Sequence, residues 1–197
     1  MLRQQAFNVI HEAISYVRRE VRDRLALADT DVIIESARVL TQRNQAQGVS
    51  ITLVNVEEEI ALRNEPATER VAGVLRRREP PVALNLYLLF AFEFQAYETS
   101  LARLSEVIGI FQSQRAFTPA TASGGNPLPP GIEGLIFEMH NMNFEALNNL
   151  WGVMGGAYHP SVVYKMRLLR IQSDAGADAP EVTALRLETG LTRRVGS

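Results

Sequence analysis

Residues 81–94 read PVALNLYLLFAFEF, and their alternation predicts a strand in the middle of a sheet. One set of alternate positions is apolar throughout: Val82, Leu84, Leu86, Leu88, Phe90 and Phe92. The other set is mixed: Ala83, Asn85, Tyr87, Leu89, Ala91 and Glu93. Because successive side chains of a strand point to opposite faces, we expect one face of this strand to be fully covered and the other to be partly covered.

The chain before this strand predicts one helix and one further strand. Residues 7–25 carry apolar side chains at every third or fourth position and predict a long amphipathic helix. Residues 49–56, VSITLVNV, alternate and are rich in β-branched residues, which is typical of a strand. Residues 28–48 predict a loop that could hold a brief strand at 32–34. The charged segment at residues 57–81 predicts a long loop or a hairpin arm.

After the central strand the apolar spacing becomes helical. Residues 96–114 predict a helix with one apolar face, formed by Tyr97, Leu101, Leu104, Ile108 and Phe111. A Gly/Pro loop, TPATASGGNPLPPG at 118–131, leads into a predicted strand at 132–139. A short helix is expected to begin at Asn143 as its N-cap, and the last clear strand is SVVYKMRLLRI at 161–171.

This order of elements predicts an α+β domain. We expect a mixed, mainly antiparallel sheet with helices packed on one face. The domain is expected to cover residues 1–172, and residues 173–197 are expected to form a C-terminal tail or arm, because the regular pattern is lost there.

Composition excludes several classes of function. The chain of 197 residues has 20 basic and 22 acidic residues, so its net charge of −2 gives no overall attraction to nucleic acid or to an anionic membrane. It has no cysteine, which removes thiol nucleophiles, disulfides and cysteine-ligated zinc. The start of the chain does not have the pattern of a signal peptide, and the longest apolar run is too short to cross a bilayer as a helix.

No group of residues predicts catalysis or a cofactor. His11, His140 and His159 lie in different predicted elements without metal-ligand spacing, so each is expected to be a surface or capping histidine. The sequence SGGNPLPPG lacks the Lys-Ser/Thr of a phosphate-binding loop. No Ser, Thr or Lys has a recognisable nucleophile setting. We therefore predict no enzyme, no cofactor and no metal.

Charged clusters favour a part that assembles with other copies. Acidic residues gather in one cluster, Glu57, Glu58 and Glu59, and basic residues in another, Arg76, Arg77 and Arg78. Neighbouring copies could join head to tail through these clusters, and such contacts close into rings when the rotation permits. Lys165 and Arg167 share the polar face of the last strand, where an interface and plain exposure to water are both open. The alternative is a small-molecule or nucleic-acid binding module that uses the Gly/Pro loop and Arg76–Arg78.

The segment between the short helix and the last strand predicts a structural turn. Gly155 and Gly156 follow the helix directly, where a left-handed residue commonly ends a helix. Pro160 disfavours helix at His159 and extends the chain into the strand. We therefore expect Gly155→Val or Gly156→Val to damage folding and His159→Ala to leave it largely intact.

Three blocks of sequence together resemble a known family. They are ITLVNVEEEIALRNEP (51–66), PPVALNLYLLFAFEFQAYETSLARLSEVIGIFQSQRAFT (80–118) and LWGVMGGAYHPSVVYKMRLL (150–169). In this order they resemble the cap, or tail-terminator, proteins of extracellular contractile injection systems, phage-tail-like particles that include the antifeeding prophage and the Photorhabdus virulence cassettes. The resemblance extends over about residues 5–172.

What this resemblance implies is a structural role. It implies a fold like that of phage tail terminators and a homohexameric ring at the baseplate-distal end of the particle. The expected partners are other copies of the chain, the inner tube protein and the sheath protein, with no nucleic acid and no membrane. The ring would end the growth of the tube and anchor the sheath, without catalysis or cofactor, in a particle assembled in the bacterial cytoplasm.

Overall fold

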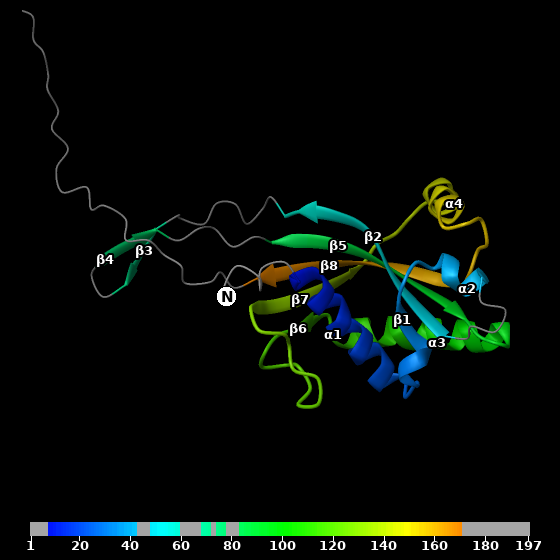
Figure 1. The fold of residues 1–197 in the computed structure, drawn as a ribbon, viewed down its shortest axis with the longest axis horizontal. Helices are drawn as coiled ribbons and strands as arrows, with labels where there is room; N and C mark the ends of the chain where they lie inside the picture. The colour runs from blue at the N-terminus through cyan, green and yellow to red at the C-terminus, as the bar shows by residue number, and fades with distance from the viewer. Residues whose placement is uncertain (1–7, 43–47, 60–67, 72–73, 78–82, 171–197) are drawn as a thin grey trace, which may run out of the picture. The chain divides into compact units, whose positions relative to one another are not determined.

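The structure is a computed structural model, and it describes residues 8–42, 48–59, 68–71, 74–77 and 83–170. Its elements follow in chain order (Figure 1): α1 (Val9–Arg24), η2 (Asp29–Asp31), β1 (Val32–Ile34), α2 (Arg38–Gln42), β2 (Gly48–Glu58), β3 (Thr68–Val71), β4 (Val74–Arg77), β5 (Leu84–Glu93), α3 (Tyr97–Ser113), β6 (Ala116–Phe117), β7 (Ile132–Met139), α4 (Phe144–Val153) and β8 (Ser161–Arg170).

Six strands form one sheet in the order β1-β2-β5-β8-β7-β6. Only β1 and β2 run parallel, and every other neighbouring pair is antiparallel. The prediction of a mixed, mainly antiparallel α+β fold is therefore confirmed. The expected central strand is also confirmed, because β5 pairs with β2 on one side and with β8 on the other.

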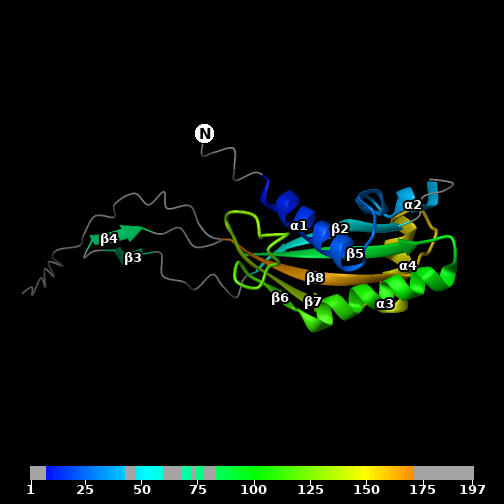
Figure 2. The same ribbon diagram turned by 90° about the horizontal axis from the view of Figure 1, so that it is seen from below.

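The two faces of β5 are covered as the alternation predicts. Leu86, Leu88, Phe90 and Phe92 are buried in the main core, together with residues of α1 and α3. On the opposite face Leu89 and Ala91 belong to a smaller cluster with Trp151 of α4 and Leu40 of α2. Figure 1 shows α3 below the strands and α4 above them, and Figure 2 looks onto the α1 and α3 side.

The expectation that the helices pack on one face holds for the two long helices only. The short helices α2 and α4 pack on the other face, because the apolar residues Leu89 and Ala91 need cover there as well. The sequence pattern did not predict α2, whose five residues are too few to show a helical period.

Helix α3 has the expected bounds, but the side of the helix that is buried differs from the predicted one. Tyr97 and Leu101 are 62% and 40% exposed. The buried residues are Ser100, Val107, Ile110 and Phe111. The apolar positions of this helix are spread too widely around it for spacing alone to select the buried side.

The segment between β2 and β5 forms a hairpin in the part that the structure describes. β3 and β4 pair antiparallel, with Thr68 opposite Arg77 and Val71 opposite Val74. The hairpin-arm alternative for this segment is thus correct, and we describe the hairpin by itself. Residues 173–197 lie outside the described residues, so the expected division at residue 172 stays a prediction.

The outer edge of β2 is only partly paired among the described strands. β1 pairs with Val49–Ile51 and no further along β2. Beyond that point the register with β5 shifts at Val54, which is a β-bulge, and the Asn55 side-chain oxygen accepts a hydrogen bond from the Val56 N–H at 2.9 Å. The edge that continues from β1 is therefore interrupted by a bulge and a side-chain hydrogen bond.

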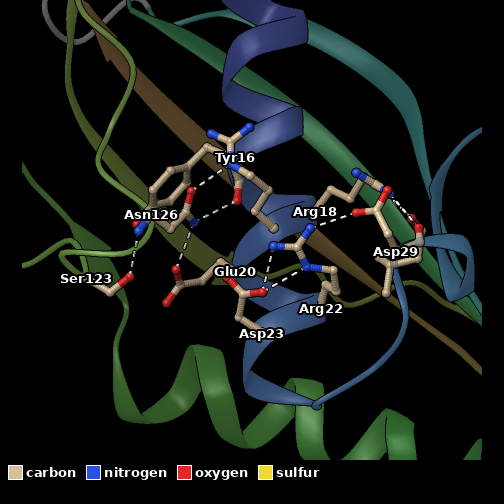
Figure 3. Close-up of polar contacts among 10 residues, drawn as sticks. Tyr16, Arg18, Glu20, Arg22, Asp23, Asp29, Ser123 and Asn126 are labelled. Atoms are coloured by element: carbon tan, nitrogen blue, oxygen red, sulfur yellow. Dashed lines mark hydrogen bonds and ion pairs between the residues drawn. The ribbon is translucent and has the colours of Figure 1, made fainter.

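Polar contacts fasten the end of α1 to the edge of the sheet (Figure 3). Arg18 donates through Nε to the Val32 carbonyl at 2.6 Å and forms an ion pair with Asp29 at 2.8 Å. Arg22 pairs with the same Asp29 carboxylate at 2.7 Å, and these two cations hold the pKa of Asp29 below its usual range. The contacts fix the η2 turn between the helix and β1.

Candidate assembly surface

Beyond the small cluster around Trp151, the same face of the sheet becomes polar. Two rows of aligned residues cross β2, β5, β8 and β7 there. One row is Asn55, Tyr87, Lys165 and Glu138, and the other is Glu57, Asn85 and Arg167, followed by Ile136. We call the seven polar residues of these rows, with Glu59, the polar face.

Glu57 is held by two neighbours within the polar face. Its carboxylate accepts from the Tyr87 hydroxyl at 2.9 Å and from the Asn55 side-chain amide at 3.1 Å. The hydrogen bond to Glu57 raises the pKa of Tyr87, and burial adds a smaller effect in the same direction. Tyr87 also meets the His140 ring edge to face, with 5.0 Å between ring centroids.

Glu59 and Arg167 form the charged centre of the polar face. The Arg167 Nε lies 3.1 Å from the Glu59 carboxylate, which also accepts from the Asn85 amide at 3.1 Å. A second carboxylate, that of Glu138, lies 4.0 Å from the Arg167 guanidinium. Arg167 is thus neutralised by acids from two other elements and is partly a structural residue of the monomer.

Lys165 differs from Arg167 because no ion pair is found for it within the described residues. It lies between Tyr87 and Glu138 in the register and is half-buried. It is also the only lysine in the sequence. A partly exposed cation without an ion-pair partner among the described residues is a candidate for contact with another subunit or protein.

The structure brings together four of the eight predicted interface residues: Glu57, Glu59, Lys165 and Arg167. Glu58 is exposed on the opposite face, because its register partner is Leu84, which packs against the main core. Arg76 and Arg77 lie in β4, and Arg78 lies outside the described residues. The contact between the acidic and basic clusters stays a prediction.

The predicted turn has the backbone that glycine favours. Gly155 and Gly156 have φ angles of 110° and 84°, a region that other residues rarely adopt. The Gly156 N–H donates to the Trp151 carbonyl at 2.8 Å, and Asn143 caps the other end of α4 through the Ala146 N–H. The Pro160 carbonyl accepts from the Phe92 N–H at 3.0 Å and so starts β8 beside β5.

His159 lies in the connection between α4 and β8, as expected, but the expectation that it is a surface histidine is wrong. Its side chain is buried, because the ring packs against Trp151 with 5.5 Å between ring centroids. Its Nδ1 lies 2.7 Å from the Glu93 carboxylate at the end of β5. His159 therefore joins the α4 layer to the central strand and has a structural role that the sequence did not reveal.

The Gly/Pro loop is bound to α1 through Asn126, which is almost fully buried (Figure 3). The Asn126 amide donates to the Tyr16 carbonyl at 3.2 Å and to the Glu20 carboxylate at 3.0 Å, and its oxygen accepts from Arg19 at 2.8 Å. These contacts use the hydrogen-bonding capacity of the side chain within the domain. They favour a structural role for the loop over a binding module.

The described residues hold no group of three or more His, Cys, Asp or Glu side chains placed to bind a metal ion. Within them, no helix combines the length and apolar character needed to cross a membrane. Sequence reasoning missed Asn85, Tyr87 and Glu138. Asn85 and Tyr87 occupy alternate positions of one predicted strand, as Lys165 and Arg167 do of another, so the sequence does place each pair on one face of its strand. It does not show that these two strands are neighbours in the sheet.

Residues 12–184 match the family described as the Pvc16 N-terminal domain. The chain belongs to this family. As a Pvc16 N-terminal domain it has similar folds among solved structures, whereas no sequence among curated proteins matches it.

Two cryo-EM structures share the fold of this Pvc16 N-terminal domain. One is the sheath/tube terminator of an extracellular contractile injection system, PVC, in its extended state. Its TM-score is 0.63 and its sequence identity 19%, and the match covers 95% of this chain and 65% of the terminator chain. The other is the tube-terminating cap of the anti-feeding prophage, with a TM-score of 0.61, 16% identity and coverages of 89% and 59%. The chain thus spans less than two thirds of either relative.

Proposed function

We propose that this Pvc16 N-terminal domain is a structural cap of a contractile injection system. It forms a homohexameric ring at the baseplate-distal end, where it terminates the inner tube and anchors the sheath. The observation that carries this proposal is the shared fold over 95% and 89% of the chain with a sheath/tube terminator and a tube-terminating cap. Its partners are other copies of itself, the tube protein and the sheath protein, in a particle assembled in the cytoplasm.

Particle length gives the direct test of this function. Particles made without the chain should have a broad distribution of lengths in electron micrographs, because nothing ends the growth of the tube. Resupply of the wild-type chain should restore a narrow distribution and a cap at one end. Particles of normal length with normal ends in the absence of the chain would contradict the proposal.

The basic cluster Arg76–Arg78, in the segment between β2 and β5, is proposed to contact a neighbouring copy. Reversal of Arg76, Arg77 and Arg78 to glutamate should leave the monomer folded, as far-UV circular dichroism would report, but give particles of abnormal length. Capped particles of normal length from the triple variant would refute the role of this cluster. Salt-dependent binding of the wild-type chain to a generic duplex would instead support the nucleic-acid alternative.

The polar face is proposed as a second contact surface, and its single lysine makes it testable. An amine-acylating reagent can react only with Lys165 and the amino terminus of the chain. We expect the acylation rate at Lys165, measured by mass spectrometry, to fall in assembled particles relative to the free chain. The amino terminus in the same sample serves as the internal reference, and an unchanged rate at Lys165 would remove the polar face from the interface.

A further inference from the structure

A small pocket lies on the face opposite α4, between the end of α3 and the end of β7. It has a volume of about 240 Å³. Its lining includes Phe111, Phe137, Tyr164 and Met139, with the exposed Gln112, Arg115 and Glu138 at its rim. We call this pocket the socket. Pockets for drug-sized ligands and cofactors usually measure about 300–1,000 Å³, so the socket fits a single side chain better.

The chemistry of the socket favours an aromatic occupant. Phe111 and Phe137 stack with 4.2 Å between ring centroids, and Tyr164 packs against Phe111 at 4.8 Å. The Tyr164 hydroxyl is buried and has no hydrogen-bond partner in the described part of the chain. A ring in the socket would pack against the aromatic and methionine side chains that line it.

The same chain carries an exposed aromatic side chain that matches. Phe144, the first residue of α4, is 91% exposed, which is unusual for a large apolar residue. It does not line the socket of its own chain. Helices α4 and α3 cover opposite faces of the sheet (Figure 1). Phe144 begins α4 and the socket borders the end of α3, so the two lie on different sides of the domain.

We propose that Phe144 of one copy inserts into the socket of a second copy. Charge supports this choice of partner, because the exposed Glu145 beside Phe144 would approach the exposed Arg115 at the rim of the socket. The acidic residue of the lining, Glu138, lies 4.0 Å from the Arg167 guanidinium of its own chain, which offsets its repulsion of Glu145. A protrusion on one face and a socket on the other make a head-to-tail contact, which can repeat and close into a ring. The inference rests on the proposed self-assembly and names the residues that perform it.

Disulfide cross-linking tests this contact in assembled particles, since the chain has no cysteine of its own. Chains with Phe144→Cys and chains with Gln112→Cys, at the socket wall, are co-expressed with the rest of the particle and oxidised. We expect disulfide-linked pairs of the two chains on a non-reducing gel. The matched control replaces Phe144→Cys with Val153→Cys, which is 83% exposed at the other end of α4 and should cross-link at least tenfold less.

Each result has a distinct meaning. Equal cross-linking from Phe144→Cys and Val153→Cys would overturn the inference and leave the proposed function standing. Cross-links from Phe144→Cys to tube or sheath subunits would also overturn it, since the occupant would then be another protein. Absence of the chain from purified particles would overturn both the inference and the proposed function.

Substitutions supply an independent measurement. Phe144→Ala should weaken self-association at least about tenfold in sedimentation experiments, as expected for an anchor residue, while the unfolding midpoint stays unchanged. Val153→Ala should change neither quantity. A combination of Arg115→Glu with Glu145→Arg should restore association that Arg115→Glu alone weakens, and failure of both the Phe144→Ala effect and this rescue would contradict the contact.

Discussion

Among the described glycines, Gly48 is the one where an added Cβ would meet backbone at the shortest distance. Its φ angle is 148°, and a Cβ at this position would overlap the carbonyl oxygen of Asp31 just before β1. Because the obstacle is backbone, it cannot move without disturbing the β1–β2 pairing. Gly48→Ala should therefore lower the free energy of unfolding by about 3 kcal/mol in urea titrations.

Gly125→Ala is the matched control for this prediction, because a Cβ at Gly125 would meet open space. It should change the free energy of unfolding by less than about 0.5 kcal/mol. Equal midpoints for the two variants would show that the turn before β1 can shift at little cost.

The buried position of His159 changes the expectation for its removal. His159→Ala deletes the contact with Glu93 at 2.7 Å and the packing against Trp151. We now expect a loss of about 1–3 kcal/mol in unfolding free energy, typical for a hydrogen bond to a charged group. His11→Ala, on the exposed side of α1, should be nearly neutral in the same assay. A His159→Ala protein as stable as wild type would restore the original expectation that this substitution leaves folding intact.

At the scale of one element, the end of α1 carries a residue that is not the best for its conformation. Ala26 has a φ angle of 51°, while the Ala26 N–H bonds to the Asp23 carbonyl and the Leu27 N–H to the Arg22 carbonyl. This is the Schellman pattern, in which glycine usually takes the left-handed position. Ala26→Gly should raise the unfolding free energy by up to about 1 kcal/mol.

The same substitution inside a helix should have the opposite sign. Ala102→Gly, at an exposed position within α3, should lower the unfolding free energy by about 1 kcal/mol. If Ala26→Gly were destabilising as well, the left-handed conformation at residue 26 would carry no strain that glycine relieves.

Elements with a clear period could be predicted from the sequence, and those fixed by long-range contacts could not. The alternation of β5 and β8 and the period of α1 gave the correct element types, because burial on one side determines those patterns. The buried side of α3 was missed, since its apolar residues occupy several directions. Helix α2 was missed because contacts between Ala37 and Thr52, far apart in the sequence, position its start.

The candidate surface shows the same limit. Glu57, Lys165 and Arg167 could be named from charge and alternation, but their meeting on one face depends on β5 lying between β2 and β8. The structural role of His159 depends on Glu93, which lies 66 residues earlier in the chain. Neither fact has a local signal in the sequence.

For the whole molecule, alkaline pH should be destabilising. Burial, reinforced by the nearby Glu20 carboxylate, raises the pKa of Tyr16 to about 12. Between about pH 10 and pH 12 the unfolded tyrosine loses its proton while the folded one keeps it, so stability falls as the pH rises. The loss due to Tyr16 should reach about 2–3 kcal/mol near pH 12.

Tyr16→Phe should make this decline shallower in urea titrations repeated from pH 8 to pH 12. Part of the slope should remain, because burial also raises the pKa of Tyr164. The exposed Tyr97→Phe variant should follow the wild-type curve. Parallel curves for wild type and Tyr16→Phe would mean that Tyr16 ionises equally in both states.

The interrupted edge of β2 bears on how the proposed terminator avoids becoming a polymer. An unprotected strand edge recruits further strands without limit, and a bulge or a charged end is a common protection against this. In β2 the Val54 bulge, the Asn55 side chain on the Val56 N–H and the exposed glutamates at the strand end provide such protection. If the proposed function is correct, this protection opposes fibril formation by copies that are not yet part of a particle.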